Sequence, residues 1–215
     1  MKPLAWSADG SGWLDGVARI DSPNFDRRPV QERSAGGPEK RQSGRAAVDL
    51  LVVHFISLPP GRFSGDAIER LFTNTLDPAR HPFFAEISQL RVSSHFLIRR
   101  RGRIVQFVDC DLRAWHAGAS EFQGRAHCND FSVGIELEGD EHHPFTMSQY
   151  RSLIALTRVL AARYSLRWMA GHSDIAPGRK IDPGPFFDWP HFASGLQGLP
   201  ISRPFGLNDK TSPTG

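Results

Sequence analysis

The stretch Val48-Asp49-Leu50-Leu51-Val52-Val53-His54-Phe55-Ile56 decides the fold class, because it is a nearly continuous apolar run rich in Val and Leu. A run of this kind predicts a central β-strand that is buried on both faces. A titratable imidazole, that of His54, is therefore expected close to the end of a buried strand. Residues 131–138 predict a second strand, because apolar and polar residues alternate there and place Glu136 on the polar face.

Helices are expected to alternate with these strands. Residues 146–164 show the clearest helical periodicity, and Thr146 with Gln149 three residues later predicts a capping box at the start of that helix. The other expected elements are short helices over 66–73 and 189–196 and a β-hairpin over 93–98 and 103–108. The sequence therefore predicts an α/β chain of the α+β type, with a central mixed β-sheet flanked by helices.

The length of the chain favours one domain. A chain of 215 residues can bury one sizeable core, and we expect a single domain over 1–198. Its first 31 residues are expected to form an ordered arm, and the polar, Gly-rich residues 34–46 a flexible loop. Residues 199–215 are expected to be a disordered tail.

The composition argues against several classes of partner. The formal net charge is +3, which falls short of the concentrated basic stripe of a nucleic-acid-binding protein. The densest basic stretch, 99–103, is expected to be a solvated hairpin tip. No apolar run is long enough to span a membrane and no secretory signal is visible, so we expect a cytoplasmic protein without membrane or nucleic-acid partners. Cys110 and Cys128 are expected to stay reduced.

The residues suited to chemistry gather in three places. They are His54 at a strand end, Glu136 on a strand, and the Gly- and Pro-rich segment 171–185, which holds His172, Lys180 and Asp182. A catalytic zinc ion needs three histidine or carboxylate ligands and one open position, and the two histidines with Asp182 can supply that set. Glu136 can then act as a general base, and Lys180 can stabilise an oxyanion.

Spacing alone leaves alternatives open. Asp174 competes with Asp182 as the carboxylate ligand, because His-x-Asp is also a compact arrangement. The competing histidines are His95, His116 and His127. A different enzyme class, a cysteine hydrolase built on Cys128, is disfavoured by geometry: neighbouring residues of an extended segment point to opposite faces, so His127 is a poor base for that thiol.

Five segments carry a resemblance to a known family. They are 22–26, 51–61, 115–118, 128–139 and 171–185. Together they resemble the AmpD family of cytoplasmic anhydro-N-acetylmuramyl-L-alanine amidases, which belongs to the zinc amidase and peptidoglycan-recognition superfamily. The resemblance runs from about Trp13 to about Phe192.

The resemblance implies a ligand set, an activity and a substrate. It implies that His54, His172 and Asp182, rather than Asp174, bind Zn²⁺. Glu136 matches the catalytic acidic residue of the family, and Lys180 matches its transition-state-stabilising lysine. The implied reaction is hydrolysis of the amide bond between muramic acid and L-alanine in anhydromuramyl peptides during cell-wall recycling. In bacteria with an inducible β-lactamase, such an enzyme keeps the lactamase repressed. A monomer is expected.

The substrate contacts are less closely defined by the sequence. Trp115 is a candidate stacking surface for the sugar, Arg91 for pairing with a peptide carboxylate, and His116 for a substrate or supporting contact. The chain departs from the family at Phe55, where Asn is usual, and at Ala126-His127. A second hypothesis is a peptidoglycan-recognition module that binds muropeptides without cutting them, although such modules characteristically lose zinc ligands.

Overall fold

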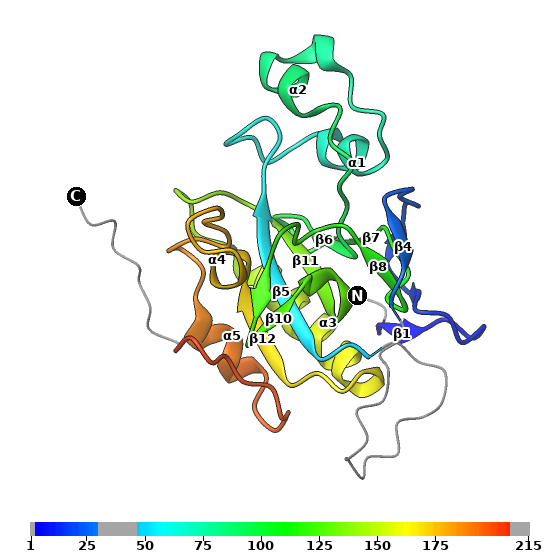
Figure 1. Cartoon of the computed structure of the whole chain (residues 1–215), viewed down its shortest axis with the longest axis vertical. Coiled ribbons are helices and arrows are strands. Elements are labelled where there is room, and N and C mark those ends of the chain that lie inside the picture. The colour runs from blue at the N-terminus through cyan, green and yellow to red at the C-terminus, as the bar shows by residue number, and fades with distance from the viewer. Residues whose placement is uncertain (1–2, 30–46, 207–215) are drawn as a thin grey trace.

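The computed structural model describes residues 3–29 and 47–206 of the chain. The loop expected over 34–46 lies outside the described residues, as does the tail beyond residue 206. A mixed sheet of six strands forms the centre, in the order β12-β5-β11-β6-β7-β3 (Figure 1). These strands span Trp168–Gly171 (β12), Leu50–Ile56 (β5), Ser132–Glu138 (β11), Phe96–Ile98 (β6), Ile104–Gln106 (β7) and Ala18–Arg19 (β3).

Short strand pairs and helices surround this sheet. The pairs are β1 (Ala5–Trp6) with β2 (Leu14–Asp15), β4 (Phe25–Arg27) with β8 (Leu112–Ala114), and β9 (Glu121–Phe122) with β10 (Arg125–Ala126). The α-helices are α1 (Ala67–Phe72), α2 (Pro82–Ile87), α3 (Met147–Arg163), α4 (His172–Ile175) and α5 (Trp189–Gly195), and the 3-10 turns are η1 (Pro78–Arg80) and η2 (Cys128–Asp130). This arrangement confirms the predicted central mixed sheet flanked by helices.

Strand β5 holds the position predicted for it. It lies between β12 and β11 and runs parallel to both, and its first five residues are buried. Strand β11 is also parallel to β6, whereas β6 and β7 form the predicted antiparallel hairpin. Because β12, β5 and β11 run in one direction, their carboxyl ends meet at one edge of the sheet, which is where ligands bind in many sheets of this kind.

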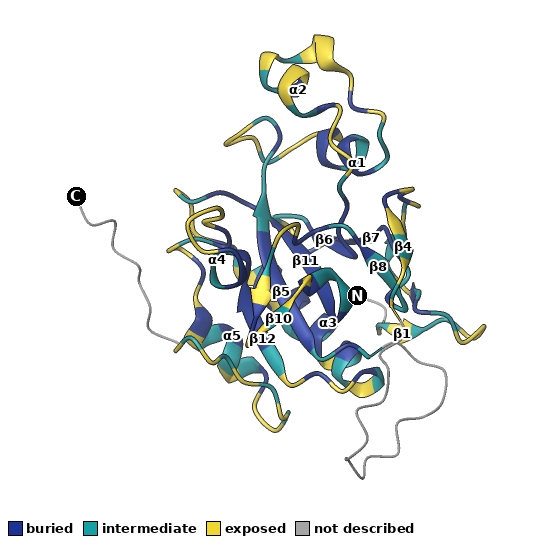
Figure 2. Cartoon of the chain, in the orientation of Figure 1, coloured by how far each residue is buried: buried dark blue, intermediate teal, exposed yellow. Residues whose placement is uncertain are grey.

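The two faces of the sheet have different covers. Leu51 and Val53 of β5 pack in one cluster with Leu153 of α3 and Phe192 of α5. The neighbouring side chain of Val52 faces the opposite way and packs with residues of the 114–131 segment and of α4. Helices α1 and α2 cover the β6–β7 end of that second face. Figure 2 shows the central strands β11 and β6 dark blue between these covers, whereas α2, at the top of the view, is largely exposed.

Helix α3 starts at the predicted capping box. The Thr146 hydroxyl accepts a hydrogen bond from the Gln149 amide N–H at 3.1 Å, and the Gln149 side-chain oxygen accepts one from the Thr146 N–H at 3.0 Å. The same hydroxyl donates to the carbonyl of Arg100 at 2.6 Å. The first turn of α3 is thereby joined to the β6–β7 turn.

Two local features go beyond what the sequence pattern indicates. The face of 131–138 that is polar in sequence is not solvated, because the 114–131 segment covers it and all seven residues of β11 are buried. The segment 171–185 is not irregular throughout, because β12 ends at Gly171 and α4 begins directly at His172. A buried polar face and a helix start both fix side chains more firmly than a loop would.

The basic turn at 99–103 was also expected to be solvated, and Arg99 contradicts this. Its side chain is 13% exposed and forms ion pairs with Glu138, at 2.6 Å, and with Glu69 of α1. Two carboxylates on the buried side of the turn thus draw one guanidinium inward, as buried charges require partners. Arg99 therefore links the hairpin turn to β11 and to α1 through ion pairs.

The chain beyond residue 198 begins with an ordered stretch. Ser202 forms a parallel bridge with Trp168 at the edge of the sheet, and its N–H donates to the Arg167 carbonyl at 2.9 Å. Arg203 pairs with Asp174 at 2.8 Å. The tail expected from residue 199 is therefore packed on the domain as far as residue 206. Among the described helices, none is both long and apolar enough to cross a bilayer.

Replacement of Thr146 by Ala should destabilise the protein by about 1 kcal/mol, because the first turn of α3 loses its cap. Urea unfolding at a fixed metal concentration measures this change. Thr146→Ser keeps the hydroxyl and should stay close to wild type. Equal losses for the two variants would contradict the role assigned to the cap.

Candidate metal centre

The strand ends bring His54, His172 and Asp182 together. Gly171 of β12 pairs in register with Val53 of β5, so the residues that follow, His172 and His54, emerge side by side. The carbonyl of Asp182 accepts a hydrogen bond from the Ser173 N–H at 2.8 Å, which folds the loop after α4 back over the strand ends. Three residues from distant parts of the sequence thus reach one point.

The ligand atoms of these three residues form a compact triangle. The Nδ1 atoms of His54 and His172 lie 3.0 Å apart, and Oδ2 of Asp182 lies 2.9 Å from the first and 3.1 Å from the second. The residues are only 1%, 4% and 8% exposed. Across the described ranges 3–29 and 47–206, no other set of three or more histidine, cysteine or acidic side chains lies close enough together to hold one ion. Ligands at tetrahedral zinc stand roughly 3.3 Å apart, so the triangle is close to the size required.

Hydrogen bonds at the far side of each imidazole determine which nitrogen faces the triangle. His172 Nε2 lies 3.0 Å from the Ala117 carbonyl oxygen, and a carbonyl can only accept, so this nitrogen carries the proton. His54 Nε2 lies 2.9 Å from His116 Nδ1, whose other nitrogen lies 3.2 Å from the Ser132 hydroxyl.

The direction of the hydrogen bonds from His54 through His116 to Ser132 follows from the Ser132 hydroxyl. The Ser132 hydroxyl lies 2.6 Å from the carbonyl oxygen of Cys128 and must donate to it. The hydroxyl oxygen therefore accepts from His116 Nε2, His116 Nδ1 accepts from His54 Nε2, and His54 Nδ1 is left without a proton. Both histidines thus present an unprotonated Nδ1 to the triangle.

A cation fits this donor set. Two nitrogen lone pairs and a carboxylate oxygen face one another at about van der Waals contact or closer in a site with little solvent, an arrangement that is repulsive without a shared positive charge. Burial and the neighbouring His172 lower the pKa of His54 to about 4, so its imidazole is neutral at physiological pH. Burial alone would raise the pKa of Asp182, but its close contacts with the His172 and His54 side chains outweigh it and hold the pKa below its usual range.

Glu136 stands next to His54 on the same face of the sheet. The two residues pair in register between β11 and β5, so their side chains project in the same direction. The carboxyl is buried, and Oε2 has no hydrogen-bond partner among the described residues. Burial raises the pKa of Glu136 well above its usual value, the Asp182 charge adds to this rise, and Lys180 opposes it. A buried carboxyl with a free oxygen is suited to proton transfer.

Lys180 acts on the site electrostatically. The residue is exposed on the loop between α4 and Asp182, and its ammonium lowers the pKa of both His54 and Glu136. Its N–H donates to the Ala176 carbonyl at 3.1 Å, at the end of α4. The cation is therefore placed beside the cluster on the solvent side.

A glycine makes room for His116 under the cluster. A Cβ atom added to Gly134 of β11 would lie 2.5 Å from Cγ of the His116 ring, well inside van der Waals contact. The ring stands edge-on to that of His54, with centroids 5.0 Å apart. The absence of a side chain at Gly134 is what allows His116 to approach His54.

The other residues selected from the sequence lie in different settings. Trp115 directly precedes His116 and is partly buried. Its backbone N–H donates to the Ser93 hydroxyl at 3.1 Å. Arg91 is exposed, and its guanidinium donates to the carbonyls of neighbouring residues of its own segment. Asp174 accepts from the Gly171 N–H at 2.7 Å and pairs with Arg203. It thus caps the start of α4.

The remaining alternatives also have defined places. His95 accepts the Gly134 N–H at 3.1 Å through Nδ1, and burial and the nearby Arg28 charge lower its pKa well below the usual value. His127 is exposed, with φ at 58°. Cys110 and Cys128 are free and buried, and burial raises the pKa of Cys128. A raised pKa opposes the thiolate that a cysteine hydrolase requires.

The fold and the cluster together define a class of protein in which a mixed sheet presents two histidines and one carboxylate, spaced to hold a metal ion, beside a buried glutamate. Comparison with known families agrees, because residues 44–185 match the family model described as N-acetylmuramoyl-L-alanine amidase. The chain belongs to this family. Within it, the chain is similar to the AmpD enzymes.

Three relatives show how far the similarity extends. The 1,6-anhydro-N-acetylmuramyl-L-alanine amidase AmpD of Escherichia coli K12 is 55% identical over 183 residues, covering 84% of this chain and 92% of the relative. The crystal structure of a selenomethionine derivative of AmpD is 50% identical, with a TM-score of 0.75, and covers 86% of this chain and 97% of that one. E. coli AmiD, solved with the substrate anhydro-N-acetylmuramic acid-L-Ala-D-gamma-Glu-L-Lys, is 30% identical, with a TM-score of 0.53 over 74% of this chain and 61% of that one.

Replacement of Gly134 by Ala should destabilise the fold by about 1–3 kcal/mol, because the added methyl overlaps the buried His116 ring. Urea unfolding of the metal-free protein measures the loss. The same substitution in a His116→Ala background should cost much less, since the overlap is gone. An equal cost in both backgrounds would show that the two residues are not in contact.

Proposed function

We propose that this chain hydrolyses the amide bond between anhydro-N-acetylmuramic acid and L-alanine in muropeptides, and that it does so with a zinc ion. The observation that carries the proposal is the triangle of His54 Nδ1, His172 Nδ1 and Asp182 Oδ2 beside the buried Glu136. The family match and the AmpD relatives support the reaction and its substrate class. N-Acetylmuramoyl-L-alanine amidase is the corresponding activity.

The triangle supplies the zinc ligands in this proposal. Two neutral imidazoles and one carboxylate would hold the ion and leave the centre with a net positive charge. When bound, the ion would supply Lewis-acid chemistry for the hydrolysis. The Nε2 partners of the two histidines keep both rings in the ligating orientation, as outer hydrogen bonds do at other zinc sites.

Glu136 and Lys180 carry the remaining steps. Glu136 accepts a proton from the attacking water through its unpaired Oε2 and then delivers it to the leaving amine of L-alanine. Its raised pKa makes the carboxylate a stronger base than an exposed glutamate. Lys180, on the solvent side, stabilises the negative charge that develops on the amide oxygen when water adds. Water is consumed, the C–N bond breaks, and a free peptide and an anhydro-sugar result.

The substrate contacts and the cellular setting complete the proposal. Trp115 offers a partly buried ring for stacking on the sugar, and Arg91 offers an exposed guanidinium to a peptide carboxylate. His116 is buried with both ring nitrogens bonded to protein groups, so we place it in support of His54 rather than against the substrate. We propose a cytoplasmic monomer that acts in peptidoglycan recycling and thereby lowers the muropeptides that induce a β-lactamase.

The purified protein should contain about one zinc ion per chain, because the described residues hold one three-ligand site. Removal of the metal by a chelator should abolish peptide release from an anhydromuramyl tripeptide, and added zinc should restore it. Elemental analysis and mass spectrometry of the products measure the two effects. Full activity in the metal-free protein would rule out the zinc mechanism, and tripeptide binding without product would favour a recognition module.

Glu136→Gln should lower kcat by about 10²–10⁴-fold, because the amide cannot accept the water proton. Zinc content should stay at the wild-type level, since Glu136 is not one of the three ligands. Glu121→Gln, which changes an exposed carboxylate on β9, is the matched control and should leave kcat unchanged. Near-normal turnover by the Glu136 variant would remove this residue from the mechanism.

A further inference from the structure

The acceptors of the Nε2 hydrogen bonds of both histidine ligands lie in one short segment. His54 donates to the His116 side chain, and His172 donates to the carbonyl of the next residue, Ala117. Any shift of the 116–117 peptide therefore moves both acceptors at once. Arg179 also donates to the Ala117 carbonyl, at 2.7 Å, but from an exposed position on the loop before Asp182.

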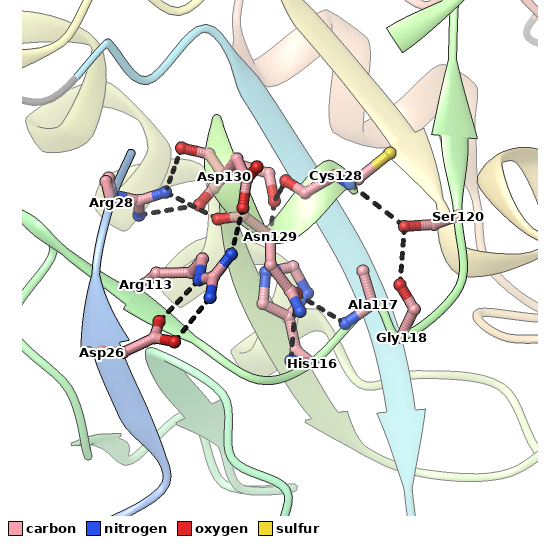
Figure 3. Close-up of polar contacts among 11 residues, drawn as sticks. Asp26, Arg28, Arg113, His116, Ala117, Gly118, Ser120, Cys128, Asn129 and Asp130 are labelled. Atoms are coloured by element: carbon pink, nitrogen blue, oxygen red, sulfur yellow. Dashed lines mark hydrogen bonds and ion pairs between the residues drawn. The ribbon is translucent and has the colours of Figure 1, made fainter. Parts of the chain in front are cut away.

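One side-chain oxygen holds this segment. Oδ1 of Asn129 accepts the backbone N–H of Ala117 at 2.8 Å and that of His116 at 3.2 Å. In Figure 3, dashed lines join the Asn129 side chain to the two consecutive N–H groups, with the His116 ring beside it. An acceptor shared by two successive N–H groups fixes both the position and the orientation of the peptide between them.

Asn129 is itself held from two sides. Arg28, at the end of the N-terminal arm, donates to the carbonyls of Asn129 at 2.8 Å and Asp130 at 3.1 Å. Arg113 ties the Asp130 carboxylate to Asp26. These contacts surround the turn η2 in Figure 3. Arg28 and Arg113 thus hold the turn in place, and the side chain of its middle residue, Asn129, bonds to the 116–117 segment.

We propose that Asn129 is a positioning residue that orients both histidine ligands of the metal centre through the 116–117 segment. The inference rests on the proposed zinc site, but it concerns a residue whose side chain bonds to the backbone of the 116–117 segment and not to the ligand atoms. Loss of the amide oxygen leaves two N–H groups of a buried segment without their acceptor, which lets the segment shift. His116 Nδ1 and the Ala117 carbonyl then move away from His54 and His172.

The test is the zinc affinity of Asn129 variants, measured by competition with a chromophoric chelator. Asn129→Ala should weaken zinc binding by about 10–100-fold, the usual effect of removing an outer partner of a metal ligand. Asn129→Asp keeps an acceptor oxygen at the same place and should retain wild-type affinity. Urea unfolding of each metal-free variant shows whether it is folded. If the alanine variant does not fold, Asn129→Ser, whose oxygen is one bond shorter, takes its place with the same expectation.

The matched control is Asn74→Ala, which removes an amide that pairs with the Asn24 side chain rather than with the 116–117 segment. It should lose stability and keep its zinc affinity. Wild-type affinity in a folded Asn129→Ala or Asn129→Ser variant would overturn the positioning role, as would equal weakening by Asn74→Ala. Absence of zinc binding by the wild type would instead refute the proposed function, so the two failures are distinguishable.

Discussion

The structure depends on one electrostatic constraint: three atoms with lone pairs, two imidazole nitrogens and one carboxylate oxygen, lie within 3.1 Å of one another in a buried site. Without a cation this arrangement is repulsive, and with one it is a coordination site. The direction of the hydrogen bonds makes the constraint strict. Both Nε2 atoms are committed as donors, so moving a proton from Nε2 to Nδ1 would break an outer hydrogen bond, and protonating Nδ1 as well would place a charged imidazolium in a buried site.

The sheet meets this constraint by its topology. Parallel β12 and β5 place the two histidines side by side, and β11 adds Glu136 in register with His54. The space beneath His54 is opened by Gly134 and filled by His116. The N-terminal arm contributes at a distance, because Arg28 holds the turn that contains Asn129. The proposed catalytic residues and their supports thus come from parts of the chain that are far apart in sequence.

The sequence allowed prediction of the elements whose residues carry a local signal. The apolar run before His54 predicted a doubly buried strand, and the Thr146–Gln149 pair predicted a helix start. The choice of Asp182 over Asp174 came from family resemblance, because both residues fit the local spacing. The supporting contacts were not predictable, since Asn129 acts through a side-chain bond to the backbone, which leaves no periodic or spacing signal. The burial of the polar face of β11 was missed because the covering segment, 114–131, has no regular pattern.

The most direct measurement is anomalous diffraction at the zinc edge from a crystal of the zinc-loaded protein. The account predicts one zinc peak bonded to Nδ1 of His54, Nδ1 of His172 and a carboxylate oxygen of Asp182, each at about 2.0–2.2 Å. A peak at another site, or ligation by Nε2 of either histidine, would contradict it. In either case the hydrogen-bond directions that define the centre would have to be reassigned.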